Sequence, residues 1–461
     1  MKKHFRLVVS TLCIAVLILA LLILVVNLYV QSKGMQNTIR ARLSESLGMR
    51  VGVFRTTFSP WGGFRMDQIK IPSDIPGSRV DFLKAEFLEV RCEYLPLLRG
   101  EVIVKRIALD SPQLVFQQNA KGQFRLPVSQ DESTKVMSKP SSQVSGTEQN
   151  ELLNVPTTSV HKWLLRDGTL RFLANDGTEL ARMETVRCSL AAQPVLGNYA
   201  GVLEIKRLIL LNRWEVTPVE ADVRVENQTL HLDKIHGEMG EGGVEGYATL
   251  DTKGDGLPYN IRFRLNKGQL AAFFEKDSEL AQELTGIVHA RLDLDGFASQ
   301  EDKNRGHVEI KVSRAKISGL PLLQVINQFV RSEEFGNLTV KKAELKADIL
   351  GSVPQIAPSY LESDHVQVTF SGPIDAAHNL DLQAQLTMDD TLFKKLPSEA
   401  RENFVKDPNR NLHSLEFVIK GPVLTPRTNL LRRIVGEKLQ RKFKSFLGEI
   451  PDDESATPIP P

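Results

Sequence analysis

The sequence predicts a mainly β protein that is held at a membrane by one N-terminal helix. Residues 7–30 form an uncharged apolar run whose polar members are Ser10, Thr11 and Asn27. Downstream, apolar and polar residues alternate with a period of two over most of the chain, which is typical of strands with one buried face. Few segments have helical spacing. We therefore expect a transmembrane helix followed by an antiparallel β-sheet with a few short helices.

The apolar run is long enough to cross a bilayer, which takes roughly 20 residues in a helix. A cleaved signal peptide is the alternative, but its apolar core would be about 7–15 residues long and would precede a small-residue cleavage site. The residues after Asn27 contain no Ala-x-Ala pattern. We therefore predict an uncleaved anchor within residues 1–30.

The orientation of the anchor does not follow from charge. Basic residues flank the run on both sides: Lys2, Lys3 and Arg6 before it, and Lys33, Arg40, Arg42 and Arg50 after it. Because the numbers of basic residues on the two sides are nearly equal, the positive-inside rule does not decide the orientation of the anchor. The short N-terminal tail is easily retained in the cytoplasm, which would place the bulk of the chain outside it.

The composition excludes one class of function and leaves the cysteines open. The formal net charge is only +2, and nothing in this charge balance suggests nucleic acid binding, so we expect no nucleic acid partner. Cys13 lies in the apolar run. Cys92 and Cys188 could form a disulfide in an oxidising compartment or remain as small buried side chains. We favour burial, because both occur on apolar faces of predicted strands.

The chain divides into two β regions around a polar segment. Residues 31–127 are predicted to begin with an amphipathic helix at 35–47 and to continue as strands, including 102–109 and 113–117. Residues 128–159 are rich in Ser, Gln, Thr, Lys and Glu, which predicts a flexible linker. Residues 160–426 return to strand alternation, interrupted by predicted helices at 268–284 and 320–330.

Residues 427–461 are predicted to form a basic amphipathic helix and a disordered tail. The helix, at 429–447, has an apolar stripe and a basic face. The residues of this candidate membrane or partner helix are Leu430, Leu431, Arg432, Arg433, Ile434, Lys438, Arg441, Lys442, Phe443 and Phe446. A terminal helix docked on the end of the sheet is an equally good interpretation.

No pattern of catalytic or metal-binding residues stands out. His231 and His236 lack the spacing of a helical metal pair, and the chain has no HExxH, GxSxG, Walker or CxxC motif. The glycines at 240–246 lack phosphate-loop spacing and predict a hairpin or bulge. Asp293 and Asp295 share one strand face and predict a solvated surface. We expect no enzyme activity, no metal and no cofactor.

Short stretches of the chain resemble the AsmA-like family of membrane-anchored periplasmic proteins. They are Tyr94-Leu-Pro-Leu-Leu-Arg-Gly-Glu-Val102, 104–116, 119–124, 243–250, 284–296, 317–323 and 417–422. The resemblance implies an anchor in the bacterial inner membrane and an elongated, curled periplasmic sheet forming an open hydrophobic groove, related to chorein-type lipid bridges. It also implies phospholipid transfer and a role in outer-membrane lipid homeostasis.

Under that resemblance, the groove is lined by apolar residues that alternate with polar neighbours. The predicted lipid-groove residues are Leu292, Val308, Ile310, Val312, Leu345, Ile349, Val368, Phe370, Leu382 and Leu386. The expected partners are membrane phospholipids and an envelope protein at the C-terminal end. The alternatives are a structural or assembly factor of the envelope that does not transport lipid, and an unusual enzyme.

Overall fold

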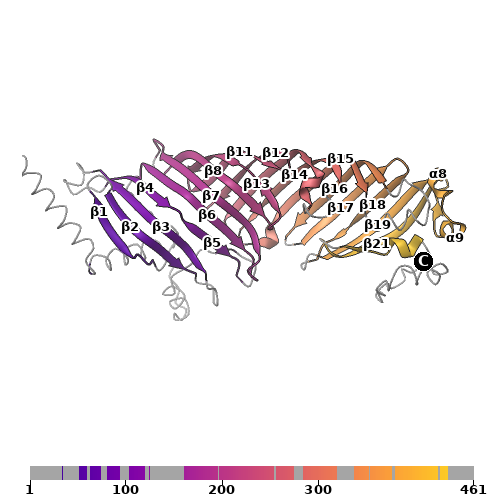
Figure 1. Cartoon of the computed structure of the whole chain (residues 1–461), viewed down its shortest axis with the longest axis horizontal. Helices are drawn as coiled ribbons and strands as arrows, with labels where there is room; N and C mark the ends of the chain where they lie inside the picture. Colours follow the sequence, from indigo (N-terminus) through magenta and orange to yellow (C-terminus); the bar gives the residue numbers. More distant parts are fainter. Residues whose placement is uncertain are drawn as a thin grey trace, which may run out of the picture. The chain divides into compact units, whose positions relative to one another are not determined.

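The structure is a computed structural model that describes residues 51–59, 63–73, 80–93, 103–119, 124 and 160–434, with Gly34 in isolation. The last range has gaps at 196, 254–255, 275–283, 299, 319–336, 352, 376–378 and 424–425. The described residues are mainly in β-strands, as predicted (Figure 1). None of the helices among them is long and apolar enough to cross a membrane. The predicted anchor, the helix at 35–47 and the linker at 128–159 lie outside the described residues.

Contacts divide the chain into two compact units, which we describe separately. Unit 1 comprises Met1–Met239, Gly243–Ile261 and Gly296–Glu301, and unit 2 comprises Gly240–Gly242, Arg262–Asp295 and Asp302–Pro461. This division does not fall at the predicted linker. Strands from both sides of residues 128–159 pair with one another in unit 1, so both predicted β regions contribute to the same sheet there.

Most strands of unit 1 pair antiparallel with a neighbour. They are β1 (Arg55–Ser59), β2 (Gly63–Pro72), β3 (Asp81–Cys92), β4 (Val104–Asp110), β5 (Gln113–Gln117), β6 (Lys162–Leu173), β7 (Glu179–Ala192), β8 (Tyr199–Leu210), β9 (Trp214–Val216), β10 (Val219–Glu226), β11 (Thr229–Met239) and β12 (Gly242–Asp251). The period-two segments predicted around 102–109 and 113–117 correspond to β4 and β5.

The prediction of a wholly antiparallel sheet is wrong at one place. Strands β4 and β5 follow one another along β6 and both pair with it in parallel, with Arg106 opposite Lys162 and Gln113 opposite Thr169. Parallel strands require a crossover connection rather than a tight hairpin, and here the crossover spans the predicted linker. Alternation in the sequence carries no information on strand direction, so it could not predict this parallel pairing.

Unit 2 contains the remaining long strands and most of the short helices. Its elements are β13 (Pro258–Gln269), η1 (Leu270–Phe273), β14 (Thr285–Phe297), η2 (Glu301–Lys303), β15 (Arg305–Ser318), β16 (Asn337–Leu350), β17 (Val353–Ser363), β18 (Val366–Pro373), β19 (Asn379–Asp389), α8 (Asp390–Phe393), α9 (Ser398–Arg401), β20 (Val405–Lys406), β21 (Leu412–Pro422) and β22 (Arg427–Thr428). Strands β13 and β14 belong to it for most of their length. From β14 to β19, and from β19 to β21, consecutive neighbours pair antiparallel.

Several long strands are interrupted by a polar residue with positive φ. Examples are Asp167 in β6, Thr185 in β7, Lys234 in β11 and Arg314 in β15, whose φ angles lie between 48° and 54°. The register of the paired strands shifts beside Asp167, where Leu165 faces Cys188 but Gly168 faces Val186. Such β-bulges bend a strand and increase its twist, so their repetition gives each sheet its curvature.

The outer edge of β21 is covered by the chain that flanks it. Strand β20 pairs with Ser414 and His413, and β22 pairs with Ile419 and Lys420. Between these two short pairings, the Asn429 side-chain oxygen accepts a hydrogen bond from the Val418 N–H at 2.9 Å. The Arg433 Nε donates to the Glu416 carbonyl at 3.1 Å. Backbone groups of this edge strand are therefore satisfied locally.

Candidate functional site

The apolar residues of unit 2 form rows that run from strand to strand. In the longest row, directly paired residues follow one another across β14, β15, β16, β17, β18, β19 and β21: Val288, Val312, Ala343, Leu361, Val368, Leu386 and Leu415. A parallel row contains Leu292, Val308, Ala347 and Ile356. We call this side of the sheet the apolar face of unit 2.

All ten predicted lipid-groove residues lie on this face. Register places Ile310 opposite Leu345, Phe370 opposite Ala384 and Leu382 opposite Ile419. The remaining ones occupy the two rows above or, for Ile349, a position opposite Gly306. Their exposure differs along the face. The predicted residues on β14 to β18 are half-buried, whereas Leu382 and Leu386 are buried. The structure thus brings them together on one surface; their binding of lipid stays a prediction.

Unit 1 has an apolar face of its own, which the sequence analysis did not assign to a site. One row of directly paired residues contains Ile71, Leu83, Leu114, Leu170, Met183, Leu208, Val216 and Met239. A second contains Phe58, Phe64, Val90, Ile107, Trp163, Leu190, Gly201, Val223 and Leu232. The alternation of these strands could have revealed the face, but the pairing of β4 with β6 was needed to join its parts.

Aromatic rings on the apolar face of unit 1 contact one another across neighbouring strands. Phe116 of β5 stacks on Phe172 of β6 with ring centroids 5.0 Å apart, and both also contact a further ring edge-on. Those edge-on partners are Phe82 and Phe124, at 5.4 and 5.8 Å respectively. Offset and edge-on pairs of this kind add about 0.5–1.5 kcal/mol beyond their buried area. The face is therefore packed from strand to strand, not merely apolar in composition.

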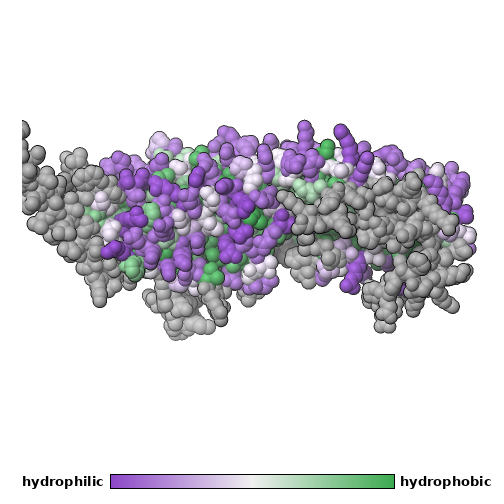
Figure 2. Space-filling model, in the orientation of Figure 1, coloured by the Kyte–Doolittle hydropathy of each residue, from purple (hydrophilic) through white to green (hydrophobic). Residues whose placement is uncertain are grey.

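The opposite side of each sheet carries ion pairs between neighbouring strands. In unit 1, Arg207 of β8 bridges Glu184 and Glu215 at 3.1 and 2.9 Å. In unit 2, Arg262 bridges Asp293 and Asp295 at 3.2 and 2.6 Å. This confirms that the two aspartates belong to a polar surface. Figure 2 shows one face of unit 1, on which hydrophilic residues predominate and hydrophobic ones are scattered.

One of these ion pairs is largely enclosed. Glu89 of β3 accepts hydrogen bonds from Arg91 and, at 2.8 Å, from Arg106 of β4. Burial alone would raise the pKa of Glu89, but the hydrogen bonds and charges of the two arginines outweigh it and lower the pKa. Glu89 is thus ionised at neutral pH and joins β3 to β4.

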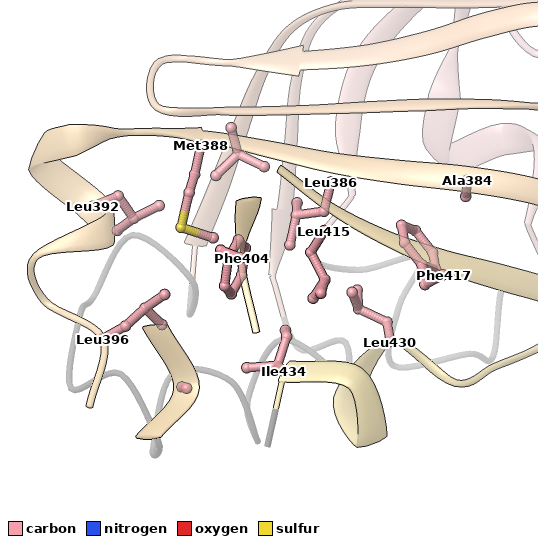
Figure 3. Close-up of a cluster of buried hydrophobic side chains, with 12 residues drawn as sticks. Ala384, Leu386, Met388, Leu392, Leu396, Phe404, Leu415, Phe417, Leu430 and Ile434 are labelled. Carbon is pink, nitrogen blue, oxygen red and sulfur yellow. The ribbon is translucent and has the colours of Figure 1, made fainter. Parts of the chain in front are cut away.

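At one end of unit 2 the apolar face is covered by the chain itself. We call residues 390–404 and 430–434 the C-terminal cap. Side chains of the cap pack on β18, β19 and β21 in one buried cluster (Figure 3): Leu392, Leu396, Ala400, Phe404, Leu430 and Ile434 meet Val366, Ala384, Leu386, Met388, Leu415 and Phe417. The half-buried Val368 and Phe370 pack against the same cluster. Two predicted groove residues therefore border the cap.

Polar contacts hold α8 of the cap to the neighbouring strands. His413 of β21 is buried, stacks on Phe393 with ring centroids 3.4 Å apart, and has its Nε2 3.2 Å from Asp390. The His365 Nδ1 lies 2.7 Å from Asp389, which also caps α8 by accepting from the Leu392 N–H. Lys394 and His413 lower the pKa of Asp390. For Asp389, burial raises the pKa, but the hydrogen bonds from Leu392 and His365 outweigh it and the net change is downward.

The first turn of the predicted C-terminal helix is docked on the sheet. Leu430 and Ile434 are buried in the cap cluster, Leu431 packs against it, and Arg432 and Arg433 are exposed. This agrees with the docked terminal helix raised as an alternative from the sequence. Lys438, Arg441, Lys442, Phe443 and Phe446 lie outside the described residues. The membrane or partner contact of this helix remains a prediction.

The cysteines of the described strands are free, and burial raises the pKa of both thiols. Cys92 is in β3 and Cys188 in β7, with β4 and β6 between them. Three strand spacings amount to roughly 14 Å along the sheet. A disulfide needs Cα atoms within about 7 Å. The structure therefore leaves the two cysteines unpaired, and both are half-buried rather than buried.

Within the described ranges, no group of three or more His, Cys, Asp or Glu side chains could hold a metal ion. Of the hairpin or bulge predicted at residues 240–246, the structure shows a two-residue turn between β11 and β12, formed by Gly240 and Glu241, both with positive φ. His231 and His236 lie on strand β11. The arrangement that remains as a candidate site is the apolar face.

No protein-family model matches this sequence, and no curated protein or solved structure matches it. The resemblance to the AsmA-like family consequently rests on the short stretches quoted above. Any function must be argued from the two apolar faces and the sequence.

Proposed function

We propose that the chain is a lipid-binding protein of the cell envelope that holds phospholipid acyl chains on its apolar faces and transfers them between membranes or partners. The observation that carries this proposal is the continuity of the apolar rows. In each unit, apolar residues on neighbouring strands pair directly, and no charged residue interrupts the row. A bound acyl chain gains about 0.8 kcal/mol for each buried CH₂ group. The ion pairs on the opposite side keep that side in water.

The proposed location is the bacterial inner membrane. The apolar run at 7–30 would anchor the chain, with a short cytoplasmic N-terminus and the bulk in the periplasm. This part is supported by the sequence and by the resemblance to the AsmA-like family. A reporter that is active only in the cytoplasm, fused after Pro461, should be silent; strong activity would reverse the assignment.

The lipid-binding proposal is tested by two substitutions on the same strand. Ile310→Asp places a charge on the apolar face of unit 2, whereas Lys316→Asp reverses a charge at an exposed position of β15. A charge without a partner is costly beside bound acyl chains and harmless in water. Lipid mass spectrometry of the full chain, purified in mild detergent, should show loss of co-purified phospholipid for Ile310→Asp only.

Circular dichroism accompanies the assay, because the same charge would also unfold an ordinary core. Equal phospholipid content in a folded Ile310→Asp protein and in the Lys316→Asp control would contradict lipid binding on this face.

The alternative function is an assembly factor that contacts other envelope proteins without carrying lipid. The cap cluster favours it in one respect, since there the chain covers its apolar face with its own side chains. The two functions differ in one measurement: an assembly factor would purify without bound phospholipid.

A further inference from the structure

We propose that the C-terminal cap is a fixed end-stop for acyl chains bound on the apolar face of unit 2. Bound chains would contact β14 to β18 and end against the cap, without reaching β19 and β21. This inference rests on the proposed lipid-binding function and specifies which part of the face takes part in it.

The longest apolar row shows where the stop begins. Val312, Leu361 and Val368 are half-buried, and the next two members of the row, Leu386 and Leu415, are buried beneath the cap. The surface on which a chain could lie therefore continues into the cluster without a change in chemistry. The second section is covered by the cap, whereas Val288, at the opposite end of the row, is buried without contributing to the cap cluster.

The packing of the cap is that of a core. Leu392 is 1% exposed, Ala400 0% and Ile434 2%, although they come from α8, from α9 and from the turn at 430–434. Core side chains packed in this way leave no room for an additional chain. A ligand could enter this section only by expelling several fully buried side chains at once.

Hydrogen bonds around the cluster join the parts of the cap to each other and to the sheet. The Asn403 side-chain NH₂ donates to the Ile434 carbonyl at 3.1 Å, which links the two segments of the cap. Arg433 is bonded to β21 through the Glu416 carbonyl, and Asp390 to β21 through His413. Since each segment is fixed independently, the cap stays closed when a ligand binds.

The stop has a consequence for the direction of transfer. A lipid on the apolar face of unit 2 cannot leave across β21. The partner predicted at the C-terminal end would then contact the outer surface of the cap without receiving lipid across that strand.

The experiment uses the full chain in membranes that contain a phosphatidylglycerol with a photoreactive diazirine at the end of one 16-carbon chain. After irradiation, mass spectrometry locates the adducts. We expect adducts on peptides from β15 to β18 and none on β19, β21 or the cap. Adducts on Leu386, Leu415 or cap residues of the unmodified protein would overturn the end-stop and leave lipid binding standing. Absence of adducts from the whole face would overturn both proposals.

A cap variant and a matched control test whether weakening the cap allows labelling of β19 and β21. Ile434→Ala removes a buried cap side chain, and Ile69→Ala removes one of similar burial from unit 1 as a control. Ile434→Ala leaves a cavity in the cap and should raise the adduct yield on β19 and β21 by about tenfold. Ile69→Ala should leave that yield unchanged. If Ile434→Ala does not fold, Asn403→Ala, which removes the side-chain hydrogen bond to Ile434, takes its place. No change in either cap variant would overturn the proposal.

Discussion

Two cores of this molecule are built in different ways. The core of unit 1 consists of Val51 and Val53 together with β2 and β3 residues Met66, Ile69, Ile71, Phe82 and Ala85, and its partly buried neighbours lie on β3, β4 and β5. The cap cluster of unit 2 also uses strands, but six of its twelve buried residues come from the cap, which consists of short helices, the bends that flank them and one helical turn. The comparison teaches that an apolar sheet face can be buried mainly by residues of neighbouring strands, as in unit 1, or by strands and added segments in equal parts, as in the cap cluster.

The largest expected effect separates the two cores. Leu392→Ala should destabilise unit 2 by about 2–5 kcal/mol, because a fully buried leucine leaves a cavity. Trp163 and Trp214 lie in unit 1, and the sequence has no tryptophan beyond Trp214. The urea unfolding transition monitored by circular dichroism should therefore shift to lower urea concentration. The transition monitored by tryptophan fluorescence should not shift.

Ile69→Ala is the matched control, and it should shift the fluorescence transition instead. If Leu392→Ala moved both transitions equally, the two cores would unfold as one cooperative unit, and the contrast between them would not extend to stability.

A second test concerns the curvature of unit 1. Gly201 lies in β8, and a Cβ built there would be 1.7 Å from the Ser189 carbonyl oxygen of β7. Gly201→Ala should therefore cost about 1–3 kcal/mol through backbone displacement. Gly243→Ala in β12 is the control, because a Cβ there meets nothing within 4 Å. Thermal unfolding of both variants measures the difference, and equal midpoints would refute a close approach of β7 and β8.

Much of the sheet could be predicted from sequence, and the cap could not. Alternation in segments such as 308–312 and 380–386 gave the strands and the side to which each residue points, because the period of a strand is two. Helices α8 and α9 are four residues each, which is too short for helical periodicity to appear. The bulges at Asp167 and Lys234 were missed for a similar reason, since neither position carries the glycine that usually signals positive φ.

A third test compares ion pairs on the polar sides. The Glu89 side chain is 14% exposed and pairs with two arginines, so Glu89→Gln should cost about 1–2 kcal/mol. The more exposed pair of Arg224 and Asp233, 2.7 Å apart, should contribute less than Glu89 does, as measured with Asp233→Asn. Urea unfolding at low and high salt checks both. Salt should reduce the second effect more than the first, and the reverse order would contradict the enclosure of Glu89.

The smallest expected effect is an acid sensitivity of the cap. Asp389 and Asp390 have lowered pKa values in the folded chain relative to the ordinary value of 3.8. Their contribution to stability is therefore fully present above about 3.8 and is lost as the pH falls through the folded-state pKa. Hydrogen exchange of residues 390–404 should rise below pH 4, and Asp390→Asn should reduce that dependence. An unchanged pH profile in Asp390→Asn would assign the effect to other groups.

The covered edge of β21 bears on how this molecule avoids self-association. A strand with free N–H and C=O groups is a template on which another chain can add a strand, and this is a common route to polymers. Strands β20 and β22, together with Asn429 and Arg433, occupy that template with residues of the same chain. A sheet built by successive hairpins could otherwise continue from one molecule into the next. At this edge the chain terminates its own sheet.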